Sequence, residues 1–156
     1  MIEIDEKGEE WFGFDLGGGN LEDPESVIAA FTGNMHYVEW FFHRYGGAKR
    51  ITLASQLNLL FERLPQKCQR AITDDRDGLI KELVRLRNRY AHGRYADAPP
   101  TFERLHALAA KVGVLLFFLE FDEWGRQKLD LESRADTLSP HLKKILSVSD
   151  RPLAQP

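Results

Sequence analysis

The segment that decides the fold is Leu79–Gly93, which reads LIKELVRLRNRYAHG. At 100° per residue, Leu83, Leu86 and Tyr90 fall within about 40° of Leu79, which predicts an amphipathic helix. The final glycine is typical of a helix C-terminus. Arg87 projects into the apolar sector, where a guanidinium needs either a partner or a function.

The polar side of the same segment carries a second pattern. Asn88 and His92 are four residues apart, and they share a face with Lys81 and Arg85. The projection places His92 on a different face from Arg87, so a site that uses both side chains is hard to build on one helix of one chain.

Helical patterns continue on both sides of this segment. Asp23 followed by Pro24 is an N-cap with proline at the first helical position, and that helix is expected to run to about Tyr45. Further helices are expected at about 51–64, 77–91, 101–121 and 141–146, with a short helical turn through Cys68. We therefore predict an all-α fold, an antiparallel bundle of four to five helices.

The chain is expected to divide into three parts. Residues 1–22 form an acidic N-terminal segment, irregular or a short hairpin; residues 23–147 form the bundle; residues 148–156 form a frayed tail. Because residues 1–25 carry nine acids and one lysine, the rest of the chain has an excess of positive charge. The basic cluster within 81–94 could bind a phosphate backbone, although a solvated basic face is the commoner explanation.

Composition limits the compartment and the cofactors. The chain has 156 residues, 43% of them hydrophobic and 29% charged, which suits one soluble globular domain. With Cys68 as its single cysteine, the chain can form neither an internal disulfide nor a cysteine zinc site. The apolar run 105–121 is interrupted by Lys111, so it predicts a central buried helix rather than a membrane span. We expect a cytoplasmic protein with no membrane contact and no cofactor.

The residue types at the end of Leu79–Gly93 suit phosphodiester cleavage. The His92 imidazole can move a proton near neutral pH, the Arg87 guanidinium can stabilise a charged phosphorane, and the Asn88 amide can hold either one in place. A structural explanation is equally compatible with the residues. In that case Arg87 pairs with a helix-terminal carbonyl or a carboxylate, and His92 is a favourable C-terminal cation.

Arg87-Asn88-x-x-x-His92 at the end of a helix, with a long apolar helix after it, resembles the signature of the HEPN superfamily. The resemblance covers roughly residues 24–121 and implies a metal-independent endoribonuclease of a prokaryotic defence, abortive-infection or toxin–antitoxin system. It also implies a homodimer in which two motifs line one cleft, with His92 handling a proton, Arg87 binding the scissile phosphate and Asn88 orienting the pair. A second copy would supply the part of the site that one helix lacks.

RNA is the partner that this resemblance implies, and an antitoxin or a defence complex is a possible further one. The expected RNA contacts are four basic residues, Lys81, Arg85, Arg89 and Arg94. Arg85 offers a second register with His92, six residues intervening, but Asn88 directly follows Arg87 and favours Arg87 as the catalytic arginine. Two alternatives stay open: a non-catalytic HEPN-like module that binds RNA or dimerises, and an accessory subunit of a larger complex.

One other cluster could bind a metal ion. His36, Glu39 and His43 lie at i, i+3 and i+7 on the first expected helix. Their neighbours are Trp40, Phe41 and Phe42, so an exposed polar stripe opposite a core face is the better explanation. We expect no metal site.

Overall fold

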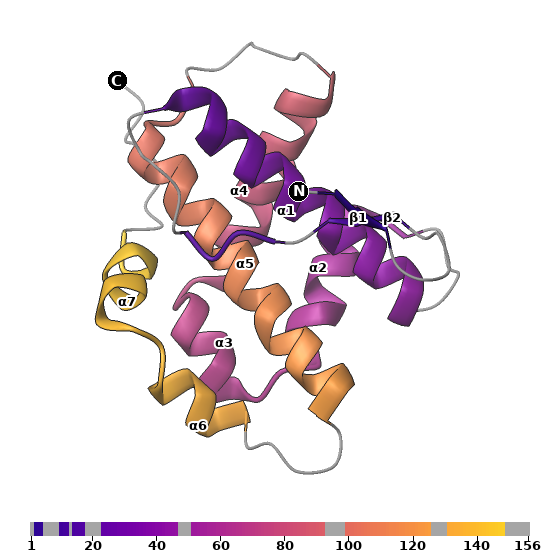
Figure 1. Ribbon diagram of the computed structural model, residues 1–156, viewed down its shortest axis with the longest axis vertical. Coiled ribbons are helices and arrows are strands. Elements are labelled where there is room, and N and C mark those ends of the chain that lie inside the picture. Colours follow the sequence, from indigo (N-terminus) through magenta and orange to yellow (C-terminus); the bar gives the residue numbers. More distant parts are fainter. Residues whose placement is uncertain are drawn as a thin grey trace.

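The computed structural model describes residues 2–4, 10–12, 14–17, 23–46, 51–92, 99–125 and 131–148. The helices are α1 (Pro24–Tyr45), α2 (Leu53–Glu62), α3 (Gln66–Ile72), α4 (Arg76–His92), α5 (Phe102–Gly125), α6 (Leu131–Asp136) and α7 (Pro140–Leu146) (Figure 1). Two short strands, β1 (Ile2–Ile4) and β2 (Glu10–Phe12), pair antiparallel near the N-terminus. The predicted all-α bundle with a short N-terminal hairpin is confirmed.

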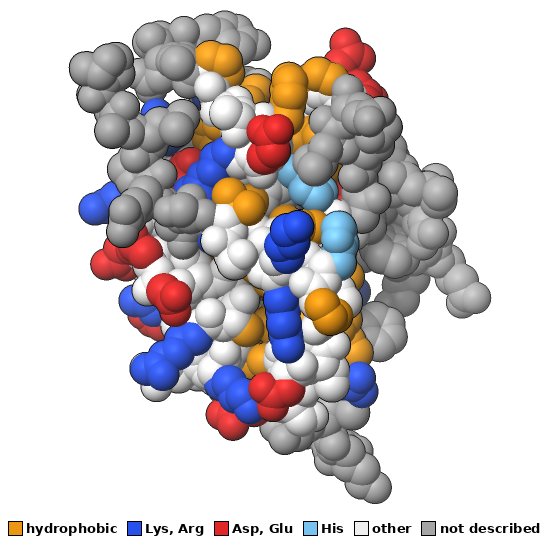
Figure 2. All heavy atoms as spheres, turned by 90° about the vertical axis from the view of Figure 1, so that its left-hand side faces the viewer, with side chains coloured by type: hydrophobic (Ala, Val, Ile, Leu, Met, Phe, Trp, Pro, Cys, Tyr) orange, Lys and Arg blue, Asp and Glu red, His pale blue; other side chains and the backbone are white. Residues whose placement is uncertain are grey.

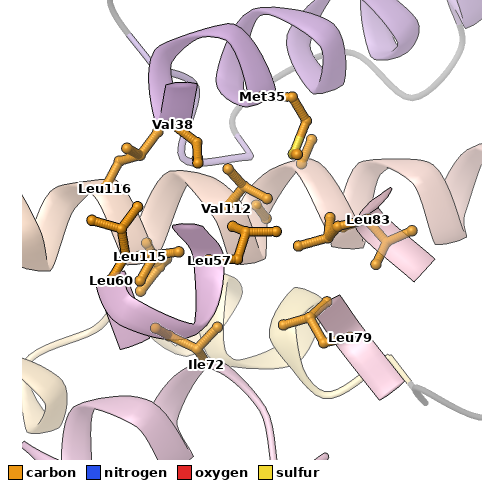
Figure 3. Packing of buried hydrophobic residues seen from close by; sticks show 14 of the residues in the cluster. Met35, Val38, Leu57, Leu60, Ile72, Leu79, Leu83, Val112, Leu115 and Leu116 are labelled. Atoms are coloured by element: carbon orange, nitrogen blue, oxygen red, sulfur yellow. The ribbon is translucent and has the colours of Figure 1, made fainter. Parts of the chain in front are cut away.

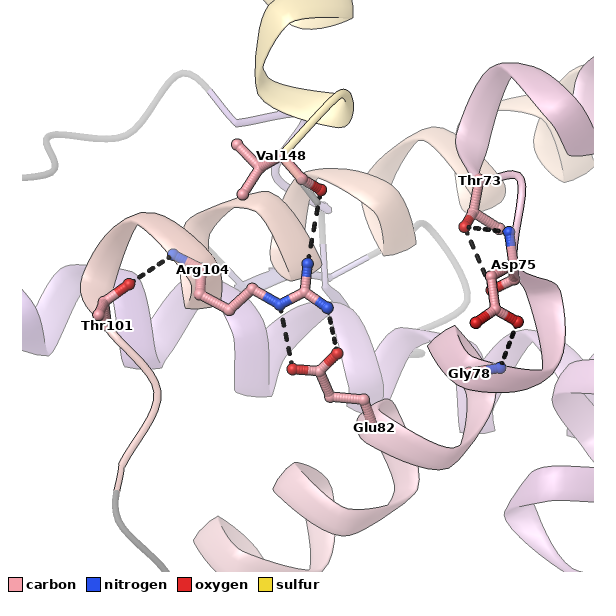
Figure 4. Close-up of polar contacts among 7 residues, drawn as sticks. All are labelled: Thr73, Asp75, Gly78, Glu82, Thr101, Arg104 and Val148. Atoms are coloured by element: carbon pink, nitrogen blue, oxygen red, sulfur yellow. Dashed lines mark hydrogen bonds and ion pairs between the residues drawn. The ribbon is translucent and has the colours of Figure 1, made fainter. Parts of the chain in front are cut away.

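Helices α1, α2, α4 and α7 begin where a side chain accepts a hydrogen bond from one of their first backbone N–H groups. The Asp23 carboxylate accepts a hydrogen bond from the Glu25 N–H at 3.2 Å, as predicted for the start of α1. At the start of α4, the Asp75 carboxylate accepts from the Gly78 N–H at 2.9 Å (Figure 4). A hydrogen bond from the Ser26 hydroxyl lowers the pKa of Asp23, so this cap is charged at neutral pH.

Two of the short helices differ from the prediction, one in its length and the other in that it was not predicted. The helical turn expected around Cys68 is a seven-residue helix, α3. Helix α6 was not predicted, since six residues are too few to show a helical period. Its Ala135 is buried, so tertiary packing contributes to holding the segment in place.

Helix α5 runs through the middle of the bundle (Figure 1). Every residue from 104 to 116 is buried, Lys111 included, which agrees with the expected central helix. Side chains of α1, α2, α3 and α4 converge on it, among them Val38, Leu57, Ile72 and Leu83 (Figure 3). Among the described residues, no helix is long and apolar enough to cross a membrane.

The segment after the strands, Phe14–Gly17, is docked on α1 and α5. The Asn34 amide of α1 accepts from the Asp15 N–H at 2.8 Å and donates to the Asp15 carbonyl at 2.9 Å. The same amide donates to the Ala109 carbonyl of α5 at 2.7 Å. One buried side chain therefore ties the N-terminal segment to both central helices.

Gly113 of α5 permits this docking, because a Cβ there would lie 2.1 Å from the Asp15 carbonyl oxygen. We expect Gly113→Ala to lower the free energy of unfolding by about 1–3 kcal/mol through overpacking. Gly33→Ala in α1 is the matched control, because its Cβ would meet nothing within 4 Å. Its better helix propensity should instead raise stability by about 0.5–1 kcal/mol. Urea unfolding of both variants measures the difference, and equal effects would contradict the close approach.

An ion pair fixes α4 against α5. The Arg104 Nε donates to Glu82 at 3.1 Å, its Nη2 makes a second bond to the same carboxylate, and its Nη1 donates to the Val148 carbonyl at 3.5 Å (Figure 4). Only 11% and 15% of the two charged side chains are exposed. This bidentate pair anchors the helix that carries the arginine and histidine of the candidate site.

Candidate active site

The C-terminal half of α4 packs across α1. Leu83 and Leu86 are buried as predicted, and the Tyr90 ring meets Phe31 of α1 edge-on, with centroids 6.0 Å apart. Arg87 lies one turn before Tyr90, so its side chain also projects toward α1. The apolar sector into which Arg87 projects is therefore the contact surface between α1 and α4.

Arg87 has a carboxylate partner on α1. Its Nη2 donates to Glu39 Oε1 at 2.7 Å, and 25% of each side chain is exposed. The pair is thus partly buried, and the carboxylate partner explains why a guanidinium is tolerated in the apolar sector of α4. Arg87 therefore has the carboxylate partner that the structural explanation predicted. This contact does not use its other terminal nitrogen, Nη1.

The other terminal nitrogen of Arg87 meets His92. Arg87 Nη1 lies 3.4 Å from His92 Nε2, although the angular projection had put the two residues on different faces. The inference that one helix could hardly bring the two side chains together was wrong, because a projection follows the Cα–Cβ direction whereas a guanidinium lies several rotatable bonds beyond it. One helix of one chain therefore brings the arginine and the imidazole together.

Two further side chains, Glu39 and His36, lie next to Arg87 and His92, and these four residues are called the Arg87 array below. His36 Nδ1 lies 3.8 Å from Glu39 Oε2, and His36 and Arg87 both line a small pocket between α1 and α4. The pocket is closed by Phe31, Thr32, Met35, Tyr90 and Ala91. The i, i+3 spacing of His36 and Glu39 predicted a metal site or an exposed polar stripe, and it gave no indication of a contact with Arg87.

Asn88 is half-buried and makes no hydrogen bond to Arg87 or His92 in the described part of the chain. Lys81 and Arg85 are exposed on the face of α4 that leads to His92, whereas Arg89 is half-buried. Arg94 lies outside the described residues.

The basic side chains of α4 differ in arrangement from the charges on the face beside α7. Figure 2 shows the face on the side of α7, where basic and acidic side chains are interspersed. On α4, by contrast, Lys81, Arg85 and His92 follow one another along one exposed face. A stripe of one sign suits a polyanion better than a mixed face does.

The three residues of α1 that were considered as metal ligands, His36, Glu39 and His43, differ in exposure and in contacts. His36 and His43 are exposed and Glu39 is half-buried, with Glu39 directed to Arg87. Within the ranges that the structure describes, no three His, Cys, Asp or Glu side chains are grouped so that they could hold a metal ion.

The array has the components of a phosphate-directed acid–base site. A guanidinium supplies fixed N–H donors for phosphate oxygens, and an imidazole beside it can accept or donate a proton near neutral pH. The carboxylate of Glu39 limits the conformations of the guanidinium, as a bonded partner does for a functional side chain.

Comparison with known proteins identifies the family of the chain. No curated protein and no solved structure matches the chain significantly. A family model described as Apea-like HEPN matches residues 11–129, which include α1 to α5 and therefore the whole Arg87 array. HEPN domains form a superfamily of RNA-cleaving and RNA-binding modules, and this chain belongs to its Apea-like HEPN family.

Proposed function

We propose that the chain is a metal-independent endoribonuclease of a defence or toxin system, with Arg87 and His92 as its catalytic residues. The observation that carries the proposal is the contact between Arg87 Nη1 and His92 Nε2 at 3.4 Å, next to an exposed basic stripe. The family membership agrees with it, since many HEPN domains act on RNA.

The reaction needs no metal ion or cofactor. His92 removes the proton of a ribose 2′-hydroxyl, the 2′-oxygen attacks phosphorus, and the bond between phosphorus and the 5′-oxygen breaks. Arg87 donates hydrogen bonds to the non-bridging oxygens, whose charge grows in the transition state. The products are a 2′,3′-cyclic phosphate and a 5′-hydroxyl, and Asn88 is proposed to orient the pair when RNA is bound.

Two copies of the chain are proposed to pair so that both motifs line one cleft, with Lys81, Arg85, Arg89 and Arg94 binding the RNA backbone. The exposed positions of Lys81, Arg85 and His92 support this arrangement, because they leave the basic stripe open to RNA. An antitoxin or a defence complex in the cytoplasm is the proposed regulatory partner.

The Glu39–Arg87 pair favours a second candidate function. Because the guanidinium already has a carboxylate at 2.7 Å, its charge is partly neutralised before any phosphate arrives. A HEPN-like module that binds RNA through its basic stripe without cutting it would have the same pair for structural reasons.

The proposal is tested with purified protein, end-labelled single-stranded RNA of randomised sequence, and EDTA. We expect the wild type to cut the RNA in EDTA and to leave cyclic-phosphate ends, and His92→Ala to lose about a hundredfold or more in rate. Cleavage that needs added metal, or that survives in His92→Ala, would contradict the mechanism. RNA binding without cleavage supports the second candidate, and a monomer at micromolar concentration contradicts the paired cleft.

A further inference from the structure

We propose that His36 of α1 is a second catalytic histidine at this site, and that it donates the proton to the leaving 5′-oxygen while His92 acts as the base. This inference rests on the proposed ribonuclease function. The observation behind it is that the Arg87 guanidinium lies between two imidazole-bearing segments of one chain. His92 meets its Nη1, and Glu39, which faces His36, meets its Nη2.

The position of His36 suits a group that touches the substrate. It lines the same pocket as Arg87, while 59% of its side chain is exposed to solvent. The assigned phosphate site is the outer edge of the guanidinium, which shares a pocket with His36 and a contact at Nη1 with His92. His43 on the same helix is also exposed but shares neither the pocket nor the contact with Glu39.

The hydrogen-bonding partners give the two rings complementary roles. A guanidinium has only N–H donors, so His92 Nε2 is the acceptor in this contact at 3.4 Å, and when RNA is bound the 2′-hydroxyl takes the place of Arg87 Nη1 at that nitrogen while Nη1 turns to the phosphate. The Nδ1 of His36 faces the Glu39 carboxylate at an ion-pair distance of 3.8 Å, so Nε2, the ring nitrogen away from this contact, is the one assigned to the substrate.

The protons balance over the reaction. His92 takes the proton of the 2′-hydroxyl as the bond from the 2′-oxygen to phosphorus forms. His36 gives its Nε2 proton to the 5′-oxygen as the bond from that oxygen to phosphorus breaks. Afterwards His92 is protonated and His36 neutral, and exchange with water restores both. Each protomer then carries a complete acid–base pair, and the paired cleft contains two of them.

The decisive experiment compares two leaving groups. We expect His36→Ala to cut an all-oxygen RNA about a hundredfold more slowly than the wild type. On the same RNA with sulfur replacing the 5′-bridging oxygen at the cleaved linkage, the defect should shrink to less than about tenfold, because a thiolate leaves without a proton. His43→Ala is the matched control, and it should cut both RNAs at the wild-type rate.

The outcomes separate this inference from the function on which it rests. Failure of the wild type to cut RNA, or cutting by His92→Ala, would overturn both. If His92→Ala is inactive and His36→Ala behaves like His43→Ala, only the role of His36 is overturned. A defect in His36→Ala that is equally large with the sulfur leaving group would make His36 a positioning residue and overturn its role as an acid.

Discussion

Replacing Arg87 by alanine is expected to lower the rate of RNA cleavage about a thousandfold at saturating substrate. A fixed donor aimed at the developing charge of a transition state contributes about 10²–10³ in kcat. Arg87 is proposed as such a donor, and its two terminal nitrogens contact Glu39 at 2.7 Å and His92 at 3.4 Å. Loss of the side chain also removes the group that orients His92. Single-turnover kinetics with the same labelled RNA measures the effect.

Arg87→Lys separates charge from geometry. A lysine keeps the positive charge but has a single ammonium, which cannot contact Glu39, His92 and a phosphate in the fixed fork of a guanidinium. We therefore expect it to recover less than about a tenth of the lost rate. Recovery to near the wild-type rate would mean that charge alone is needed at this position, and that the contact with His92 has no catalytic consequence.

Arg85→Ala is the control for the register of the motif. Arg85 is exposed two residues before Arg87, and it was the alternative partner of His92 in the sequence. We expect this variant to raise KM a few-fold and to leave kcat within about twofold, because loss of one phosphate contact weakens binding more than chemistry. A fall in kcat as large as that of Arg87→Ala would favour Arg85 as the catalytic arginine.

The candidate motif could be proposed from the sequence, but the residues that contact it from other helices could not. The apolar period around Leu83, Leu86 and Tyr90 defined the helix, and the chemistry of Arg87 and His92 followed from their types. Glu39 lies 48 residues before Arg87, and only the packing of α1 against α4 brings the two together. A single sequence contains no signal for that pairing, and the spacing of His36 and Glu39 was equally consistent with an exposed stripe.

The bundle itself was predictable because its signals are local. Asp23 with Pro24, Ser139 with Pro140, and the apolar run of α5 each define a helix within a few residues. The docking of the Phe14–Gly17 segment was not predictable, since it depends on the Asn34 amide and on the missing Cβ of Gly113, residues far away along the chain. Helix α6 was missed because six residues carry too little periodicity.

The largest expected effect on stability is at the ion pair between α4 and α5. Arg104→Ala leaves the Glu82 carboxylate with 15% of its side chain exposed and without its bidentate partner. An uncompensated charge in such a site costs about 3–5 kcal/mol. For a chain of this length that corresponds to a fall of roughly 10 °C in Tm, which thermal unfolding followed by circular dichroism measures.

Two further variants distinguish a buried charge from a lost contact. Lys67→Ala removes an exposed pair, since 46% of Lys67 and 66% of Asp136 are exposed, and it should cost less than about 1 kcal/mol. The double variant Arg104→Met with Glu82→Leu removes both charges and fills the space, so most of the lost stability should return. If the double variant is as unstable as Arg104→Ala, then the geometry of the pair, and not the desolvated charge, holds α4 to α5. Because α4 carries Arg87 and His92, the double variant should also keep the wild-type rate of RNA cleavage, provided that α4 keeps its position against α5.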